Sequence, residues 1–135
     1  MLDINTSVRF IFPNAPIRPV TINGGMEMRA WYDIDPGAPL AGGNDIQNSM
    51  RAIRSIVEEE IAAGIPSARI ALGGFSQGGV IALELGLSFD QPLAGIMALS
   101  TYLHDHENIT QRIGLANVDT PIFMAHGLSD PVIPI

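Results

Sequence analysis

Apolar residues recur at helical spacing in the stretch between residues 45 and 64. The positions that repeat every three or four residues are Ile46, Met50, Ile53, Ile56, Val57 and Ile61. This spacing predicts an amphipathic helix, with Asn44 or Asp45 as its N-cap and Gly64 as its stop. A second helix is expected from residue 77 to about residue 88, directly after an apolar run.

Four short apolar runs have the length of strands: residues 8–12, 68–74, 93–100 and 121–126. Strand and helix alternate, and the runs lack the polar alternation of half-exposed strands. Both features predict a mainly parallel sheet of about four strands, flanked by helices and covered on both faces. Residues 17–44 are rich in Gly and Pro and predict a long loop. No repeat or linker interrupts the chain, so we expect a single α/β domain over residues 1–135.

Composition excludes several classes of protein. Hydrophobic residues make up 47% of the chain and charged residues 16%, which is not the composition of a disordered chain. The chain has seven Lys and Arg and 14 Asp and Glu, so it lacks the clustered cations that a protein uses to bind nucleic acid. There is no Cys for a disulfide or a thiolate metal site. Without a signal peptide or an apolar run of about 20 residues, we expect a cytoplasmic protein with no membrane partner.

The pentapeptide Gly74-Phe75-Ser76-Gln77-Gly78 lies between a predicted strand and a predicted helix. In this context Gly-x-Ser-x-Gly forms a tight, strained turn, whose glycines let the strand and the helix approach each other. The hydroxyl of Ser76 then projects from the carboxyl edge of the sheet, and the N–H of Gln77 points at a developing oxyanion. A glycine-rich turn that merely contains serine is the alternative. The strand and helix on either side favour a nucleophile.

Residues 69–79 resemble the nucleophile elbow of the phospholipase/carboxylesterase family, which includes the acyl-protein thioesterases. Residues 12–34, 98–103 and 125–134 resemble further segments of that family, in the same order. The resemblance implies a reduced α/β-hydrolase fold and places the triad acid at Asp130. It also implies that Trp31 lines an acyl pocket, for which ordinary packing is the alternative. The family's triad histidine and one of its oxyanion loops have no counterpart in these 135 residues.

Three histidines are candidates for the missing base. His126 lies four residues before Asp130, at a position where the family also has histidine, and a structural role is the preferred interpretation. His104 and His106 follow the strand next to the elbow strand. A solvated turn is preferred for this pair, with catalysis or metal binding as the alternative.

The elbow and the resemblance together predict a serine carboxylesterase. It would hydrolyse short-chain carboxylic esters or thioesters through an acyl-enzyme on Ser76, without a cofactor or a metal. The alternative is a catalytically incomplete fragment that folds, self-associates and only binds. In the family, another strand lies between the strands that correspond to residues 8–12 and 70–73. Its absence would leave two apolar edges, so a homo-oligomer that completes the sheet is expected.

Overall fold

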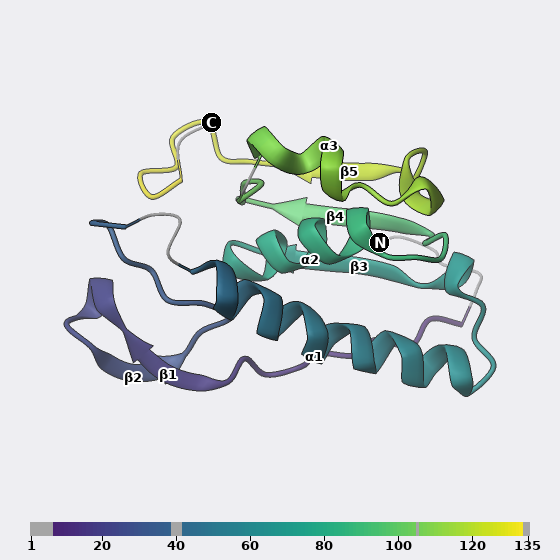
Figure 1. The fold of residues 1–135 in the computed structure, drawn as a ribbon, viewed down its shortest axis with the longest axis horizontal. Coiled ribbons are helices and arrows are strands. Elements are labelled where there is room, and N and C mark those ends of the chain that lie inside the picture. The colour runs from purple at the N-terminus through teal and green to yellow at the C-terminus, as the bar shows by residue number, and fades with distance from the viewer. Residues whose placement is uncertain (1–6, 39–41, 105, 134–135) are drawn as a thin grey trace.

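The computed structural model describes residues 7–38, 42–104 and 106–133. Its main sheet is parallel and has the order β3-β4-β5, formed by Ala71–Phe75, Gly95–Leu99 and Ile122–Ala125. In register, Gly73 lies opposite Met97, and Met97 lies opposite Phe123. A separate antiparallel hairpin, β1 (Ile17–Val20) and β2 (Met26–Arg29), lies beside the start of the first helix (Figure 1).

Two long helices accompany the sheet: α1 covers Gly43–Ala62 and α2 covers Gln77–Ser88. Both agree with the predicted helices to within two residues at each end. The stretch after β4 contains the short helix α3, Ile109–Arg112. Four single turns of 3-10 helix complete the described elements: η1 (Thr21–Asn23), η2 (Ser67–Arg69), η3 (His106–Asn108) and η4 (Leu115–Asn117).

The core forms where α2 packs on β3 and β4, because nearly every side of this helix is apolar. Val80 and Leu85 are almost fully buried on α2, and Leu72 and Ile96 meet them from the sheet. Ile46, Met50 and Val57 add the apolar face of α1 to the same core. The helical spacing read from residues 45 to 64 is therefore explained by contact with α2.

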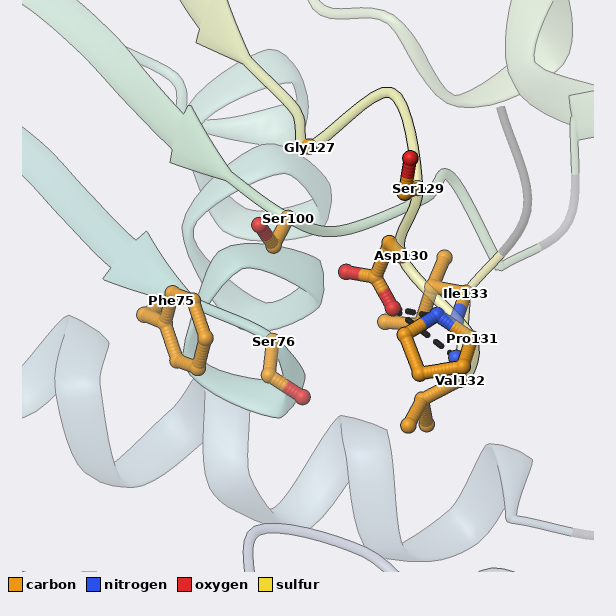
Figure 2. A pocket seen from close by; sticks show the side chains of 9 residues that line it. All are labelled: Phe75, Ser76, Ser100, Gly127, Ser129, Asp130, Pro131, Val132 and Ile133. Carbon is orange, nitrogen blue, oxygen red and sulfur yellow. Dashed lines mark hydrogen bonds between the residues drawn. The ribbon is translucent and has the colours of Figure 1, made fainter.

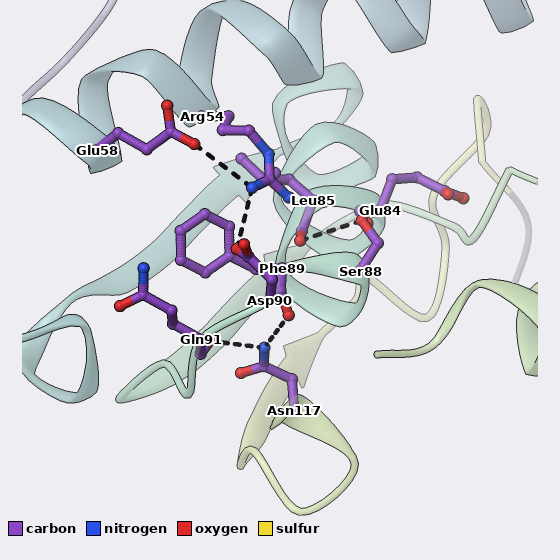
Figure 3. Close-up of polar contacts among 9 residues, drawn as sticks. All are labelled: Arg54, Glu58, Glu84, Leu85, Ser88, Phe89, Asp90, Gln91 and Asn117. Carbon is purple, nitrogen blue, oxygen red and sulfur yellow. Dashed lines mark hydrogen bonds and ion pairs between the residues drawn. The ribbon is translucent and has the colours of Figure 1, made fainter. Parts of the chain in front are cut away.

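Asn117 fastens the loop between α2 and β4. Its amide donates to the carbonyl oxygens of Phe89 and Gln91 at 2.8 and 2.9 Å (Figure 3). Its carbonyl oxygen accepts from the N–H of Leu93 at 2.9 Å and from the hydroxyl of Thr120 at 2.7 Å. The side chain is only 1% exposed. A buried polar residue thus satisfies main-chain groups that no regular element satisfies.

Arg54 joins α1 to the same loop. Its guanidinium lies 4.6 Å from the ring centre of Phe89 and forms ion pairs with Glu58 and Asp90 (Figure 3). A guanidinium above an aromatic ring is attracted by the negative face of the ring. This contact holds the end of α2 against α1.

Three predictions about the fold are wrong. Residues 8–12 form no strand, because none of the described strands pairs with them; Arg9 instead forms an ion pair with Glu60 of α1. The predicted loop over residues 17–44 contains the hairpin, closed by Gly24 and Gly25 with φ of 68° and 78°. These left-handed values favour glycine.

The third error concerns the faces of the main sheet, which the sequence predicts to be covered on both sides. Helix α2 covers the face that carries Leu72 and Ile96. On the opposite face Phe75, Met97 and Phe123 are 67%, 45% and 62% exposed. Uninterrupted apolar strands therefore do not guarantee two covered faces.

Candidate active site

Ser76 occupies the turn between β3 and α2, with φ of 51° and ψ of −123°. A positive φ is strained for a residue with a side chain, and such strain is found at functional sites. The N–H of Ser76 donates to the carbonyl of Leu99 at 2.9 Å, which ties the turn to β4. The expected strand, turn and helix around Ser76 are all present.

Gly74 explains why the turn can be so tight. A methyl group on its Cα would lie 2.1 Å from the main-chain carbon and oxygen of Gly78. Main-chain atoms cannot rotate away, so the first turn of α2 can approach β3 only if residue 74 is glycine. The first glycine of the motif has a steric role here.

A pocket of about 500 Å³ opens beside this turn (Figure 2). Ser76 and Asp130 both line it, and they come from segments more than 50 residues apart in the chain. The full lining consists of Phe75, Ser76, Ser100, Gly127, Ser129, Asp130, Pro131, Val132 and Ile133. The structure thus brings together two of the residues that the sequence selects as catalytic.

Asp130 is held by its own turn. Its Oδ1 accepts the N–H of Val132 at 2.9 Å and the N–H of Ile133 at 3.0 Å (Figure 2). These hydrogen bonds, that of Ile133 first, lower the pKa of Asp130 below its ordinary value, and the nearby His126 adds to this. The carboxylate is therefore charged and fixed in direction at neutral pH.

None of the described histidines lines this pocket. His126 Nε2 lies 2.7 Å from the carbonyl oxygen of Ile133 and 3.6 Å from Asp130 Oδ2, so the ring braces the turn that carries Asp130. The ring of His104 lies 6.3 Å from that of Tyr32. His106 is exposed in η3, and Asp105 beside it lies outside the described residues. Among described residues, no three His, Cys, Asp or Glu side chains gather as a metal site.

Trp31 lies beside the residues that follow Ser76. Its main-chain N–H donates to Gln77 Oε1 at 3.0 Å, and Gln77 Nε2 donates to the carbonyl of Tyr32 at 2.8 Å. The indole nitrogen would be 3.7 Å from a methyl group placed on Gly78. The predicted acyl-pocket residue is therefore next to the elbow, whereas other residues line the pocket itself.

Two further contacts around the elbow were not predicted from the sequence. Thr101, buried after β4, donates its hydroxyl to the carbonyl of Ser76 at 2.8 Å. The hydroxyls of Tyr32 and Tyr102 lie 3.1 Å apart, and burial, reinforced by Tyr102, raises the pKa of Tyr32. The sequence signals for Thr101 and Tyr102 are their position after the strand next to the elbow strand and their place in the family-like segment of residues 98–103.

Comparison with known proteins decides the family. A model of the phospholipase/carboxylesterase family matches residues 4–135. The chain belongs to this family. Members with similar sequences include acyl-protein thioesterase 1 of Yarrowia lipolytica, 43% identical over 129 residues, and that of Saccharomyces cerevisiae, 42% identical over 129 residues. Each alignment covers 93% of this chain and 57% of the relative.

The fold agrees with this membership. The crystal structure of SOBER1 from Arabidopsis thaliana superposes with a TM-score of 0.78 and 31% identity, over 88% of this chain and 59% of that one. The chain has a reduced α/β-hydrolase fold and spans a little over half the length of the relatives that it matches. Across its described part, none of the helices is both long and apolar enough to cross a membrane.

Proposed function

We propose that this chain carries the nucleophile and the acid of a serine hydrolase that cleaves short-chain carboxylic esters or thioesters. The observation that carries the proposal is the shared pocket, where a serine on a strained turn and a charged, fixed aspartate meet. Family membership supports the substrate class, because relatives are named as acyl-protein thioesterases. The pocket supports the chemistry.

In the proposed mechanism Ser76 Oγ attacks the carbonyl carbon while a histidine accepts its proton. The main-chain N–H of Gln77 stabilises the oxyanion of the tetrahedral intermediate. When the intermediate collapses, the histidine returns the proton to the leaving alcohol or thiol, and an acyl-enzyme remains. Water then repeats the sequence and releases the acid. Asp130 orients the histidine, which another position or another subunit supplies.

Hydrolysis of p-nitrophenyl butyrate by purified protein tests the proposal. Ser76→Ala is expected to reduce hydrolysis to the rate without protein, because the acyl-enzyme cannot form. Ser55→Ala removes a serine on the exposed side of α1 and serves as the matched control. Equal rates for the wild type and Ser76→Ala would overturn the esterase proposal.

The source of the base is tested separately. His104, His106 and His126 are each replaced by Ala, and a resident base shows itself as a loss as large as that of Ser76→Ala. If none of the three matters, free imidazole in the buffer is expected to raise the rate of the wild type. Imidazole also hydrolyses p-nitrophenyl esters without protein, so Ser76→Ala is expected to show only this background rise, because imidazole then has no Ser76 hydroxyl to deprotonate.

The second candidate function is a self-associating binding module, and the outer edge of β3 favours it. Ala94 donates to the carbonyl of Ile70, and Ser76 donates to that of Leu99, so the main-chain groups at these positions face β4. The direction of the main-chain N–H and C=O groups alternates along a strand. The groups of Ala71, Gly73 and Phe75 therefore face away from β4. No strand within the described ranges pairs with this edge of β3, and such an edge beside exposed apolar side chains suits a second copy. Sedimentation equilibrium tests this, and a monomer mass at every concentration would exclude it.

A further inference from the structure

The carbonyl oxygen of Ser76 accepts more hydrogen bonds than it needs. Ser76 precedes α2, and its carbonyl accepts from the N–H groups of Gly79 and Val80 at 2.9 and 3.2 Å. Thr101 adds its hydroxyl as a third donor, at 2.8 Å. A carbonyl oxygen has two lone pairs, which the two N–H groups already engage. The bond from Thr101 is therefore surplus to the needs of that oxygen and indicates another role.

Two features of the chain bring the hydroxyl of Thr101 to this carbonyl. Thr101 is 5% exposed and lies against Gly79, where a methyl group would be 2.7 Å from the threonine hydroxyl oxygen. Ser100, directly before it, has φ of 43°, a left-handed value that is unfavourable for a residue with a side chain. The N–H of Ser100 donates to the carbonyl of Ala125 at 2.8 Å, which ties this turn to β5. The glycine leaves room for Thr101, and the left-handed residue sets the direction in which the chain continues to it.

The carbonyl of Ser76 and the N–H of Gln77 belong to one planar peptide unit, so a contact that fixes the first group also fixes the second. In a trans unit the two groups point in opposite directions. The carbonyl points into α2, so the N–H points out of the beginning of the helix. Because Gln77 is the first residue of α2, its N–H has no acceptor within the helix, and such groups bind anions. A donor to the carbonyl also polarises the unit and strengthens its N–H as a donor.

We propose that Thr101 is a positioning residue, which aims and polarises the N–H of Gln77 by donating its hydroxyl to the carbonyl of Ser76. This role rests on the proposed esterase function, in which that N–H stabilises the oxyanion. Thr101 is not among the residues that line the pocket, so it acts through the peptide unit and not by contact with the substrate.

Two substitutions separate the hydroxyl of Thr101 from its packing. Thr101→Val keeps the branched shape and removes the hydroxyl, whereas Thr101→Ser keeps the hydroxyl and removes the methyl group beside Gly79. Thr110→Val, at an exposed position of α3, is the matched control. If Thr101 only fills space, Thr101→Ser is the more damaging change, because it leaves a cavity. If Thr101 acts through its hydroxyl, Thr101→Val is the more damaging change for catalysis.

The hydrolysis of p-nitrophenyl butyrate distinguishes these two cases, with imidazole in the buffer where the wild type requires it. A whole oxyanion donor contributes roughly 100- to 1000-fold to kcat. Thr101→Val leaves the N–H of Gln77 in place but less polarised and less firmly aimed, so kcat should fall by roughly tenfold. The KM should change by less than about twofold, because the oxyanion is absent from the bound substrate. Thr101→Ser and Thr110→Val should keep the kcat of the wild type. Equal losses of kcat in Thr101→Val and Thr101→Ser would refute the proposal.

Nuclear magnetic resonance tests the same contact without any need for activity. A hydrogen bond to a carbonyl deshields its carbon and, through the polarised peptide unit, the amide nitrogen that follows. We expect the carbonyl carbon of Ser76 and the amide nitrogen of Gln77 to shift upfield in Thr101→Val, and to keep their wild-type shifts in Thr101→Ser and Thr110→Val. Unmoved resonances in Thr101→Val would overturn the proposal whatever the kinetics. If the wild type shows no Ser76-dependent hydrolysis at all, the esterase proposal fails, and these resonances still decide whether Thr101 polarises the N–H of Gln77.

Discussion

Gly79→Ala tests the packing behind the elbow, because two opposing effects can be weighed. Residue 79 lies in α2, where alanine is ordinarily more favourable than glycine by about 1 kcal/mol. The new methyl group, however, would lie 2.6 Å from Cβ and Cγ2 of the buried Thr101 and 2.7 Å from its hydroxyl oxygen. Overpacking of this kind costs about 1–3 kcal/mol. We expect the clash to outweigh the helix preference and the substitution to destabilise the protein.

Urea unfolding followed by circular dichroism measures the effect, and Thr101 supplies the repair. Thr101→Ala leaves the offending Cβ in place, whereas Thr101→Gly removes it. In a double-variant cycle, Gly79→Ala with Thr101→Gly is expected to recover about 1–3 kcal/mol relative to the sum of the single changes. Gly43→Ala is the matched control, since a methyl group there meets no atom within 4 Å. A Gly79→Ala variant as stable as wild type, with no coupling to residue 101, would refute the reasoning.

Two further predictions follow from buried and charged groups. Asn117→Ala leaves the carbonyls of Phe89 and Gln91 and the N–H of Leu93 without their partner. This change should lower the free energy of unfolding in urea by roughly 3–5 kcal/mol. The control Asn44→Ala, at an exposed position, should change it little. A loss below about 1 kcal/mol would contradict that role. The pKa of Asp130 is lowered in the folded state, so its contribution to stability is present above its unfolded value of about 3.9 and fades as the pH falls through its folded value. The difference in unfolding free energy between wild type and Asp130→Asn should therefore shrink only below about pH 4. In the pH profile of kcat/KM, the acid limb should lie near the ordinary histidine pKa of about 6.5. An acid limb near about pH 4 would mean that Asp130 itself titrates.

The elements that the sequence predicts well are those whose signal is local. The helix of residues 43–62 shows its apolar face as a period, and the elbow needs only glycines and a serine in five consecutive positions. The hairpin of residues 17–29 was missed because its strands, each of four residues, mix polar and apolar residues. Residues 8–12 have a strand composition without a partner to pair with. Strand pairing depends on residues far apart in the chain, so the composition of one segment does not predict it.

The same division applies to the site. Ser76 and Asp130 were selected because each lies in a recognisable motif, but their position in one pocket depends on the parallel order of β3, β4 and β5. Thr101 forms one side-chain hydrogen bond and Gln77 forms two, all to distant main-chain groups. None of these contacts leaves a pattern in the chain. Only the folded arrangement reveals them.

The proposed nucleophile, Ser76, and the proposed acid, Asp130, are each held in place by neighbouring residues. The strain on Ser76 is imposed by Gly74 and the start of α2, and the charge on Asp130 is secured by the N–H groups of Val132 and Ile133. Neither arrangement requires a histidine to be in place. A base that enters this pocket would meet the half-buried Ser76 in its lining and an ionised carboxylate already fixed in direction. Under the proposed mechanism the limiting step is the delivery of one imidazole between them, so added imidazole and the Ser76→Ala control together give the decisive measurement.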